Sequence, residues 1–498
     1  MNKHKAFSKI LLLVLAGLSL GAGRGLAAEL ELYMDSETKQ LFAEPGPNRI
    51  ALGTFRSVSD SEENVAQATN QPATADLPVL RLEQLEQRMV GNETALAQVR
   101  QQQVNQIERE HWTDSFGIRG YLQTRYTTML GGDEGINLWP DRSVGDDTSL
   151  KDADKNLLIR RARLVFHGDV GERLSFYIQP DLASTVGGTG HGVQMRDAYG
   201  DLYLSKDRVH RLRVGQSKVP FGFENTQSSS NRLALDRNDA LNSAVRDERD
   251  LGVFYYYTPG HVQARFREIA ALGLKHSGNY GMFGFGVYNG QGANRGDRND
   301  NQHTVVRLTY PWRFDDGQFF EAGIQAYSGR YVPSTAAYRG ADDISRIAVI
   351  PEQYRNGYDD ERIAISALWY PQPFGLQAEW NWGRSPQLDL ATNTIGQGSV
   401  NGGYIQAMFK LDGTYGTFLL FLKWQYFDGA NKGEANAPVN NVNDFELGLE
   451  WLIAPEVELT AVWHHMHRNN LVTGNREGRP DYLRFDADAL RLQLQYNY

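Results

Sequence analysis

The sequence contains no cysteine in 498 residues. Small secreted domains use disulfides to compensate for a limited core, so this chain must be stabilised by other interactions. Long apolar runs are also scarce, and the one extended run covers residues 10–20. A membrane-spanning helix needs about 20 apolar residues, and the mean hydropathy of -0.50 is low. A bundle of membrane helices is therefore excluded.

The short apolar run has the flanks of an export signal. Lys3, Lys5 and Lys9 precede it, and the small-residue stretch at residues 21–28 follows it. A charged start, an apolar middle and a small-residue end are typical of a secretory signal peptide. We predict a signal peptide over residues 1–27, with a retained N-terminal anchor as the alternative.

The chain also has no excess of positive charge, because its formal net charge is -9. This balance gives no reason to expect a nucleic-acid partner. Glycine and aromatic residues are abundant instead, with 50 Gly, 24 Tyr, 22 Phe and 9 Trp. That combination fits a sheet-rich protein with tight turns and aromatic belts.

The region before residue 116 divides into two parts. Residues 28–78 look irregular and predict a periplasmic segment that ends in a flexible linker. Residues 79–112 predict a helix, whose apolar seam contains one polar member: Leu82, Leu85, Met89, Asn92, Leu96 and Val99. Such a seam indicates a coiled coil that joins subunits, with Asn92 setting the register. The alternative is a lone solvated helix, since barely three heptads are marginal in isolation.

From Phe116 to Tyr498 the apolar pattern has a period of two. The stretch "GIRGYLQTRYTTM" (residues 117–129) and the final "LRLQLQYNY" (residues 490–498) both alternate apolar and polar residues. Alternation indicates strands with one apolar face. We count about seventeen candidate strands and predict sixteen, because bacterial single-chain barrels use an even number. Residues 250–277 hold either one strand or two.

The connections between these strands alternate in length. Short ones occur at residues 168–172, 205–209, 370–375 and 453–456, and long ones at residues 184–192, 221–248, 331–360, 383–401 and 429–443. Short turns at one rim and long loops at the other are typical of an outer-membrane barrel. The predicted fold over residues 116–498 is thus an all-β, antiparallel transmembrane barrel. In a closed barrel the last strand pairs with the first.

Several blocks of sequence resemble one known family. These are residues 31–47, 157–182, 196–204, 212–224, 249–256 and 286–300. Together they are similar to the phosphate-selective porin O and P family. The resemblance implies a sixteen-stranded, trimeric porin of a Gram-negative outer membrane that needs no cofactor. It also implies a loop folded into the pore, which here is residues 221–248.

Strand parity assigns the side chains that line the pore. If apolar neighbours face lipid, the inner wall carries Arg119, Arg125, Arg161, Arg163, Arg211 and Arg213. A column of arginines can replace part of the hydration of an anion, because the planar guanidinium binds two oxygens at once. Lys218 has outward parity unless Gly215 or Pro220 marks a bulge, and it is a candidate for the rim.

Acidic residues with the same inward parity could offset the positive charge of this column. Asp197 and Asp201 also have inward parity, and the pore loop and its exit carry Arg232, Arg237, Arg246 and Arg249 among six acids, which are Glu224, Asp236, Asp239, Asp247, Glu248 and Asp250. The acids could neutralise the column or create a transverse field. They could also pair with the arginines and simply rigidify the wall.

We therefore expect a passive channel for small hydrophilic solutes that prefers anions such as phosphate. The alternatives are an unselective porin, or one for sugars or organic acids. A barrel enzyme such as a phospholipase would need a catalytic triad near one rim, and no strand offers that spacing. A structural barrel with a plugged lumen is a further alternative. His465 and His467 share a strand face but have no evident third metal ligand, so no metal site is expected.

Overall fold

The structure is a computed structural model that describes residues 30–35, 41–42, 49–55, 115–133, 155–186, 189–339, 345–472 and 481–498. The chain divides into two compact units, residues 1–95 and 96–498, and each is described by itself. The predicted signal peptide and coiled coil lie outside the described residues, and so do the boundaries predicted for them.

The first unit contains a small antiparallel sheet. Its strands are β1 (Leu30–Asp35), β2 (Leu41–Phe42) and β3 (Arg49–Phe55), in the order β2-β1-β3. The prediction of irregular chain was therefore wrong for this stretch. The two longer strands, "LELYMD" and "RIALGTF", do not alternate strictly between apolar and polar residues, and turn residues dominate the sequence between them.

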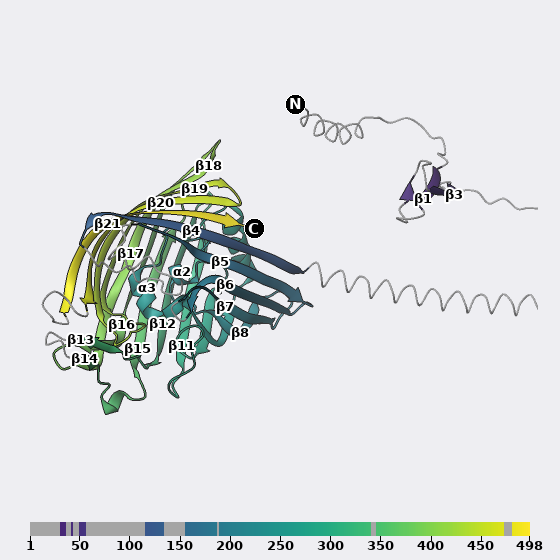
Figure 1. Ribbon diagram of the computed structural model, residues 1–498. Coiled ribbons are helices and arrows are strands. Elements are labelled where there is room, and N and C mark those ends of the chain that lie inside the picture. The colour runs from purple at the N-terminus through teal and green to yellow at the C-terminus, as the bar shows by residue number, and fades with distance from the viewer. Residues whose placement is uncertain are drawn as a thin grey trace, which may run out of the picture. The chain divides into compact units, whose positions relative to one another are not determined.

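The second unit contains a closed antiparallel barrel of sixteen strands (Figure 1), which confirms the predicted fold and strand number. In chain order the strands are β4 (Phe116–Gly132), β5 (Lys155–Val170), β6 (Leu174–Val186), β7 (Thr189–Tyr203), β8 (His210–Lys218), β9 (Arg249–Tyr257), β10 (Phe283–Tyr288), β11 (His303–Arg313), β12 (Phe319–Tyr331), β15 (Tyr358–Trp369), β16 (Phe374–Asp389), β17 (Thr394–Gly413), β18 (Gly416–Ala430), β19 (Val439–Ala454), β20 (Val457–Val472) and β21 (Asp481–Asn497).

The barrel closes where its last strand pairs with its first, as predicted. In this seam between β21 and β4, Leu492 lies opposite Tyr126. The chain end takes part, because Gly120 N donates to Tyr498 O at 2.6 Å and Tyr498 N donates to Gly120 O at 3.0 Å. A Cβ at Gly120 would lie 2.3 Å from the carbonyl oxygen of Arg163. The close approach of three chain segments therefore requires glycine at residue 120.

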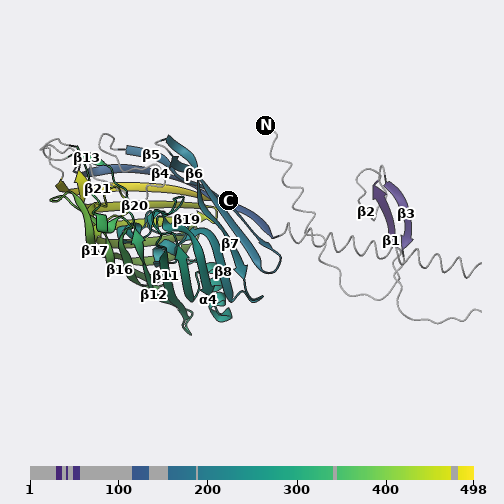
Figure 2. The same cartoon turned by 90° about the horizontal axis from the view of Figure 1, so that it is seen from below.

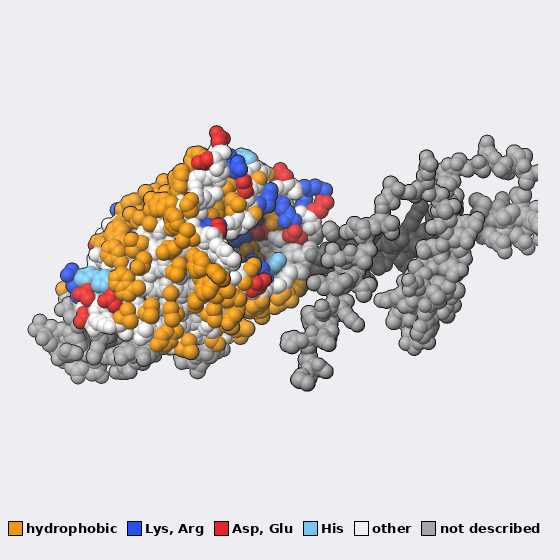
Figure 3. Space-filling model, turned by 90° about the horizontal axis from the view of Figure 1, so that it is seen from above, with side chains coloured by type: hydrophobic (Ala, Val, Ile, Leu, Met, Phe, Trp, Pro, Cys, Tyr) orange, Lys and Arg blue, Asp and Glu red, His pale blue; other side chains and the backbone are white. Residues whose placement is uncertain are grey.

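The outer face of the barrel is apolar. Outward side chains such as Leu202, Ile363 and Leu447 are 43%, 53% and 51% exposed, and Figure 3 shows hydrophobic atoms covering the wall between charged ends. Outward aromatic rings cluster near both rims. Trp312, Phe320 and Trp369 form the cluster near the short turns, and Trp380, Trp424 and Tyr426 form one toward the other rim. Two aromatic girdles around an apolar band are the surface that a lipid bilayer requires.

Residues 250–277 contain one strand, which settles the question that the sequence left open. The strand β9 is followed by the helix α4 (Gly260–Ala271), whose residues Val262, Phe266 and Ile269 are buried. Their spacing of four and three residues is that of one helix face. Among the described residues, no helix is both long and apolar enough to cross a membrane.

The short connections lie where they were predicted, but two predicted long loops were wrong. Residues 184–192 and 383–401 belong largely to strand hairpins, in which only residues 187–188 and 390–393 separate the strands. These strands extend past the apolar band, so their polar residues resembled loops. The connection between β12 and β15 does contain irregular chain, with β13 (Ala337–Arg339), β14 (Ser345–Ile347) and η2 (Glu352–Tyr354).

Candidate functional site: the barrel interior

Residues 221–248, here called the inner loop, fold into the barrel after its fifth strand, as predicted (Figures 1 and 2). The loop contains α2 (Phe223–Thr226), α3 (Asp239–Ala244) and η1 (Arg246–Glu248). The wall holds both helices, and Arg362 on β15 donates to the carbonyl oxygen of Ala240 in α3 at 2.9 Å. Glu379 Oε2 on β16 accepts hydrogen bonds from the backbone N–H groups of Phe223, at 2.6 Å, and Glu224, at 3.1 Å. Lys423 on β18 forms a 2.8 Å ion pair with Glu224.

Asp236 of the inner loop is bound by three arginines of the wall. Its carboxylate lies 3.0 Å from Arg125 on β4, 3.0 Å from Arg160 on β5 and 2.7 Å from Arg491 on β21. Burial alone would raise the pKa of Asp236, but the arginines outweigh it and hold that pKa well below its ordinary value. The inner loop is thus fastened across the seam that closes the barrel.

Glu248, at the exit of the inner loop, is the second carboxylate that several basic side chains surround. Arg249 lies 2.5 Å from its carboxylate, and Lys218, Arg232 and Arg237 each lie 3.5 Å away. Burial opposes ionisation of this carboxylate, but the surrounding cations hold the pKa of Glu248 well below its ordinary value. Arg249 also forms a 2.9 Å ion pair with Asp197 on β7.

Lys218 lies inside the barrel rather than at the rim. It is 5% exposed, and its Nζ donates to the carbonyl oxygen of Gln227. Gly215 has a φ of 128°, and the alternation of burial along β8 stops there, so that Gln216, Ser217 and Lys218 are all buried. The rim position was therefore wrong, and the exception named for Gly215 applies, because parity cannot be carried past a strand irregularity.

The remaining sequence-predicted arginines of the wall and loop fall into two groups. Arg161 donates to Gln123 Oε1 at 2.8 Å, and Arg163 forms a 2.7 Å ion pair with Asp181. Both side chains are buried, so they reinforce the wall. In contrast, Arg246 is partly exposed and lies 3.7 Å from Asp247.

Arg119, Arg211 and Arg213 share an open cavity at the short-turn mouth. This cavity, here called the vestibule, has a volume of about 400 Å³. Arg213 binds both carboxylate oxygens of Asp201, at 2.7 and 2.9 Å, and Arg211 lies 3.6 Å from the same group. The lining consists of Ser115, Arg119, His167, Gly168, Asp169, Ser175, Phe176, Tyr177, Tyr199, Asp201, Arg211, Arg213, Asn279 and Tyr280.

Stacked rings orient the arginines of the vestibule. The rings of Tyr177 and Tyr199 lie 5.2 Å apart and almost parallel, and the guanidinium of Arg213 lies 3.7 Å from the centre of the Tyr199 ring. Arg119 lies 5.9 Å from the centre of the Tyr177 ring. Guanidinium groups held over aromatic faces lose mobility but keep their charge. The vestibule is therefore a pre-organised basic surface.

The family model of the phosphate-selective porin O and P family matches residues 135–498. The chain belongs to this family. It is therefore an outer-membrane channel, and its matched region leaves out residues 31–47, which had also suggested the resemblance. No curated protein matches the chain.

Several solved structures are similar to this porin at low identity. The outer-membrane channel DcaP of Acinetobacter baumannii is 14% identical, with 77% of this chain and 97% of that chain covered and a TM-score of 0.45. An anion-selective porin from Comamonas acidovorans is also 14% identical, with 77% and 99% covered and a TM-score of 0.44. OmpT of Vibrio cholerae is 10% identical, with 77% and 97% covered and a TM-score of 0.47.

The sequence reading of the porin missed two wall arginines. Arg160 and Arg196 are both buried inside, although parity directs them outward. Each lies beside a register shift, which occurs between Gln123 and Thr124 for the first and between Gln179 and Pro180 for the second. Pro180 was an available signal, because proline inside a strand often marks a bulge.

Two of the three histidines of β20, His465 and His467, lie on the outer face of the porin. His465 is 3.0 Å from Asp488 and stacks on Trp463, and His467 is paired with Asp486. No group of three metal-ligating side chains occurs in the part of the chain that the structure describes.

Proposed function

We propose that this porin is a passive diffusion channel that prefers anions, with phosphate or similar oxyanions as its solutes. The charge of the vestibule carries the proposal. Two carboxylates line it, and Asp169 is engaged by Arg208 at 2.8 Å. Asp201 then faces both Arg211 and Arg213, while Arg119 is exposed to the open space. Basic side chains in a narrow mouth raise the local concentration of anions.

The deeper arginines have another role in this proposal. Arg125, Arg161 and Arg163 are buried against the inner loop and the wall, which supports the rigidifying role considered from the sequence. Arg119 and Arg211 are the wall residues that contact solutes. Their forked N–H groups fit the oxygens of phosphate in pairs.

The experiment is the reversal potential of the purified protein in a planar bilayer under a potassium chloride gradient. We expect the sign of an anion-preferring channel, and partial block by added phosphate. Arg119→Gln and Arg211→Gln should each reduce the preference. Arg355→Gln is the matched control, because it removes the same charge from a residue whose side chain is 75% exposed in a loop. A cation-preferring potential would reject the proposal, zero potential would favour an unselective porin, and no conductance would favour a plugged barrel.

We also propose that the porin is exported by the signal peptide at residues 1–27 and assembles as a homotrimer. The predicted coiled coil at residues 79–112 supports this assembly, because it directly precedes the first barrel strand. An amphipathic seam buries its apolar residues only against other copies.

A further inference from the structure

The connection between β9 and β10 enters the barrel from the short-turn mouth. This segment, residues 258–282, is here called the inner connection; it begins at the rim and contains α4. Leu274 and Lys275, which follow α4, are only 3% and 5% exposed. A simple periplasmic turn would be short and solvated, so this connection has a different role.

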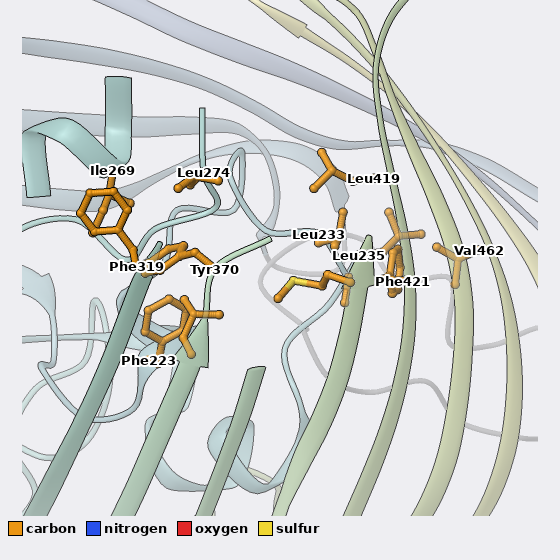
Figure 4. Close-up of a cluster of buried hydrophobic side chains, with 13 residues drawn as sticks. Phe223, Leu233, Leu235, Ile269, Leu274, Phe319, Tyr370, Leu419, Phe421 and Val462 are labelled. Atoms are coloured by element: carbon orange, nitrogen blue, oxygen red, sulfur yellow. The ribbon is translucent and has the colours of Figure 1, made fainter. Parts of the chain in front are cut away.

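The inner connection builds an apolar core inside the lumen (Figure 4). Its residues Ile269 and Leu274 belong to one buried cluster with Leu233 and Leu235 of the inner loop. Inward side chains of the wall complete it, and they are Phe319, Leu368, Met408, Leu419, Phe421 and Val462. The strands that supply them run from β12 to β20, so a packed core fills the lumen along that side.

Acidic side chains lie on the same side of the wall. The inward carboxylates from β12 to β20 include Glu321, Glu379, Asp444, Glu446, Glu450 and Glu458, and each is less than 9% exposed. Lys275 of the inner connection neutralises two of them, with its Nζ 2.5 Å from Glu450 and 3.7 Å from Glu458. Burial alone would lower the pKa of Lys275, but these two carboxylates raise it above its ordinary value.

The inner connection also reaches the other two parts of the interior. Gln227 Nε2 donates to the carbonyl oxygen of Lys275 at 3.0 Å, which ties the connection to the inner loop. Arg211 donates to the carbonyl oxygen of Asn279 at 2.7 Å. Asn279 and Tyr280 then line the vestibule. One segment therefore contacts Glu450 and Glu458 on the acidic side and also borders the basic side.

We propose that the inner connection determines selectivity by sealing the acidic wall of the barrel, so that solutes meet only the basic wall of β4 to β8. This inference rests on the proposed anion preference. Carboxylates open to the lumen would attract cations and offset the arginines. All of them are buried, and Glu450 and Glu458 are also paired with Lys275, so they contribute little field to the path of a solute.

The test opens the core with Leu274→Asn and uses Leu272→Asn as its control. Leu272 lies in the same connection but is 46% exposed, so its variant should match the wild type. For Leu274→Asn we expect conductance to rise about twofold. The anion-to-cation permeability ratio should fall about threefold, because newly exposed carboxylates attract cations. A folded Leu274→Asn variant with unchanged conductance and permeability would overturn the inference.

A second measurement does not depend on conductance. The chain has no cysteine, so Thr460→Cys introduces a single thiol directly opposite Glu450 in the β19–β20 pairing, at a position 5% exposed. We expect slow reaction with an aqueous thiol reagent, whereas Ser175→Cys in the vestibule should react fast. Equally fast reaction of both would refute the seal even if the wild type prefers anions. A wild type without anion preference would instead reject the proposed function. Slow reaction of the thiol at residue 460 would, even then, show that this part of the wall is sealed.

Discussion

The carboxylate of Asp236 lies 2.7 Å from the guanidinium of Arg491, and this contact fastens the inner loop to the last strand of the barrel. Arg125 and Arg160, on the first two strands, bind the same carboxylate. One loop residue therefore bridges the seam at which the barrel closes.

Asp236→Asn should destabilise the barrel strongly, because it leaves three buried arginines without the charge that binds them. Removing one partner from a buried ion pair costs about 3 kcal/mol or more. The urea midpoint of the protein in detergent micelles measures this loss, and the current noise of single channels should rise as the loop loosens. Asp207→Asn, at an exposed turn, is the control. An unchanged midpoint would show that the cluster does not hold the loop.

Acidification should stabilise the porin through Asp239 between about pH 6 and pH 4. Burial is the main cause that raises the pKa of Asp239 to about 6, and its ion pair with Arg468 only partly offsets it. The unfolded chain has an ordinary pKa of about 3.9. The folded state therefore binds the extra proton in this window, and stability rises as the pH falls.

The rise in stability on acidification should be smaller in Asp239→Asn than in the wild type. The measurement is the difference in urea midpoint between pH 7 and pH 4.5, compared between wild type and variant. Asp236 and Glu248 have lowered pKa values, so their contribution is lost only below the ordinary carboxylate range and does not mask the effect. Equal differences in both proteins would contradict the assignment to Asp239.

Gly120→Ala should impair closure of the barrel, whereas Gly131→Ala should not. Both glycines lie on β4, but a Cβ at Gly120 would collide with Arg163 and Tyr498, and a Cβ at Gly131 would meet nothing within 4 Å. The folded fraction can be read from heat-modifiable migration on electrophoresis gels. If both variants folded equally well, the seam would have to be looser than its hydrogen bonds indicate.

Deletion of residues 79–112 should convert the porin to monomers without unfolding the barrel. The predicted seam would be lost, while the strands from Phe116 onward would keep their pairing. Light scattering of the protein in detergent gives the mass of the assembly. Asn92→Leu is the finer test, since a buried polar residue fixes register at a cost in stability; this variant should be more stable but less uniform in oligomeric state. A trimer that persists after the deletion would place the subunit contacts elsewhere.

The sequence predicted the barrel well because lipid imposes a strict period on its strands. Leu492, Leu202 and Arg213 all lie on the predicted faces, as the burial pattern shows. Parity failed where the backbone departs from regular pairing, at Arg160, Arg196 and Lys218. Those departures depend on the partner strand, which a single sequence does not reveal.

The interior was harder to predict than the wall. The charged residues of the inner loop were named from the sequence, but their partners could not be assigned, because the contacts of Asp236 join residues more than 70 positions apart. The inner connection was missed for another reason. Its helix has an amphipathic pattern that is ordinary for a soluble core, and in a stretch already expected to hold strands this pattern had no evident surface to cover.

The inner loop and the inner connection enter from opposite mouths and meet in the middle, where Gln227 and Asn231 donate to the carbonyl oxygens of Lys275 and His276. The segments that enter from the two sides of the membrane are thereby joined inside the lumen, in addition to their contacts with the strands. A molecule that pulls on the loop from outside is expected to move the periplasmic helix as well.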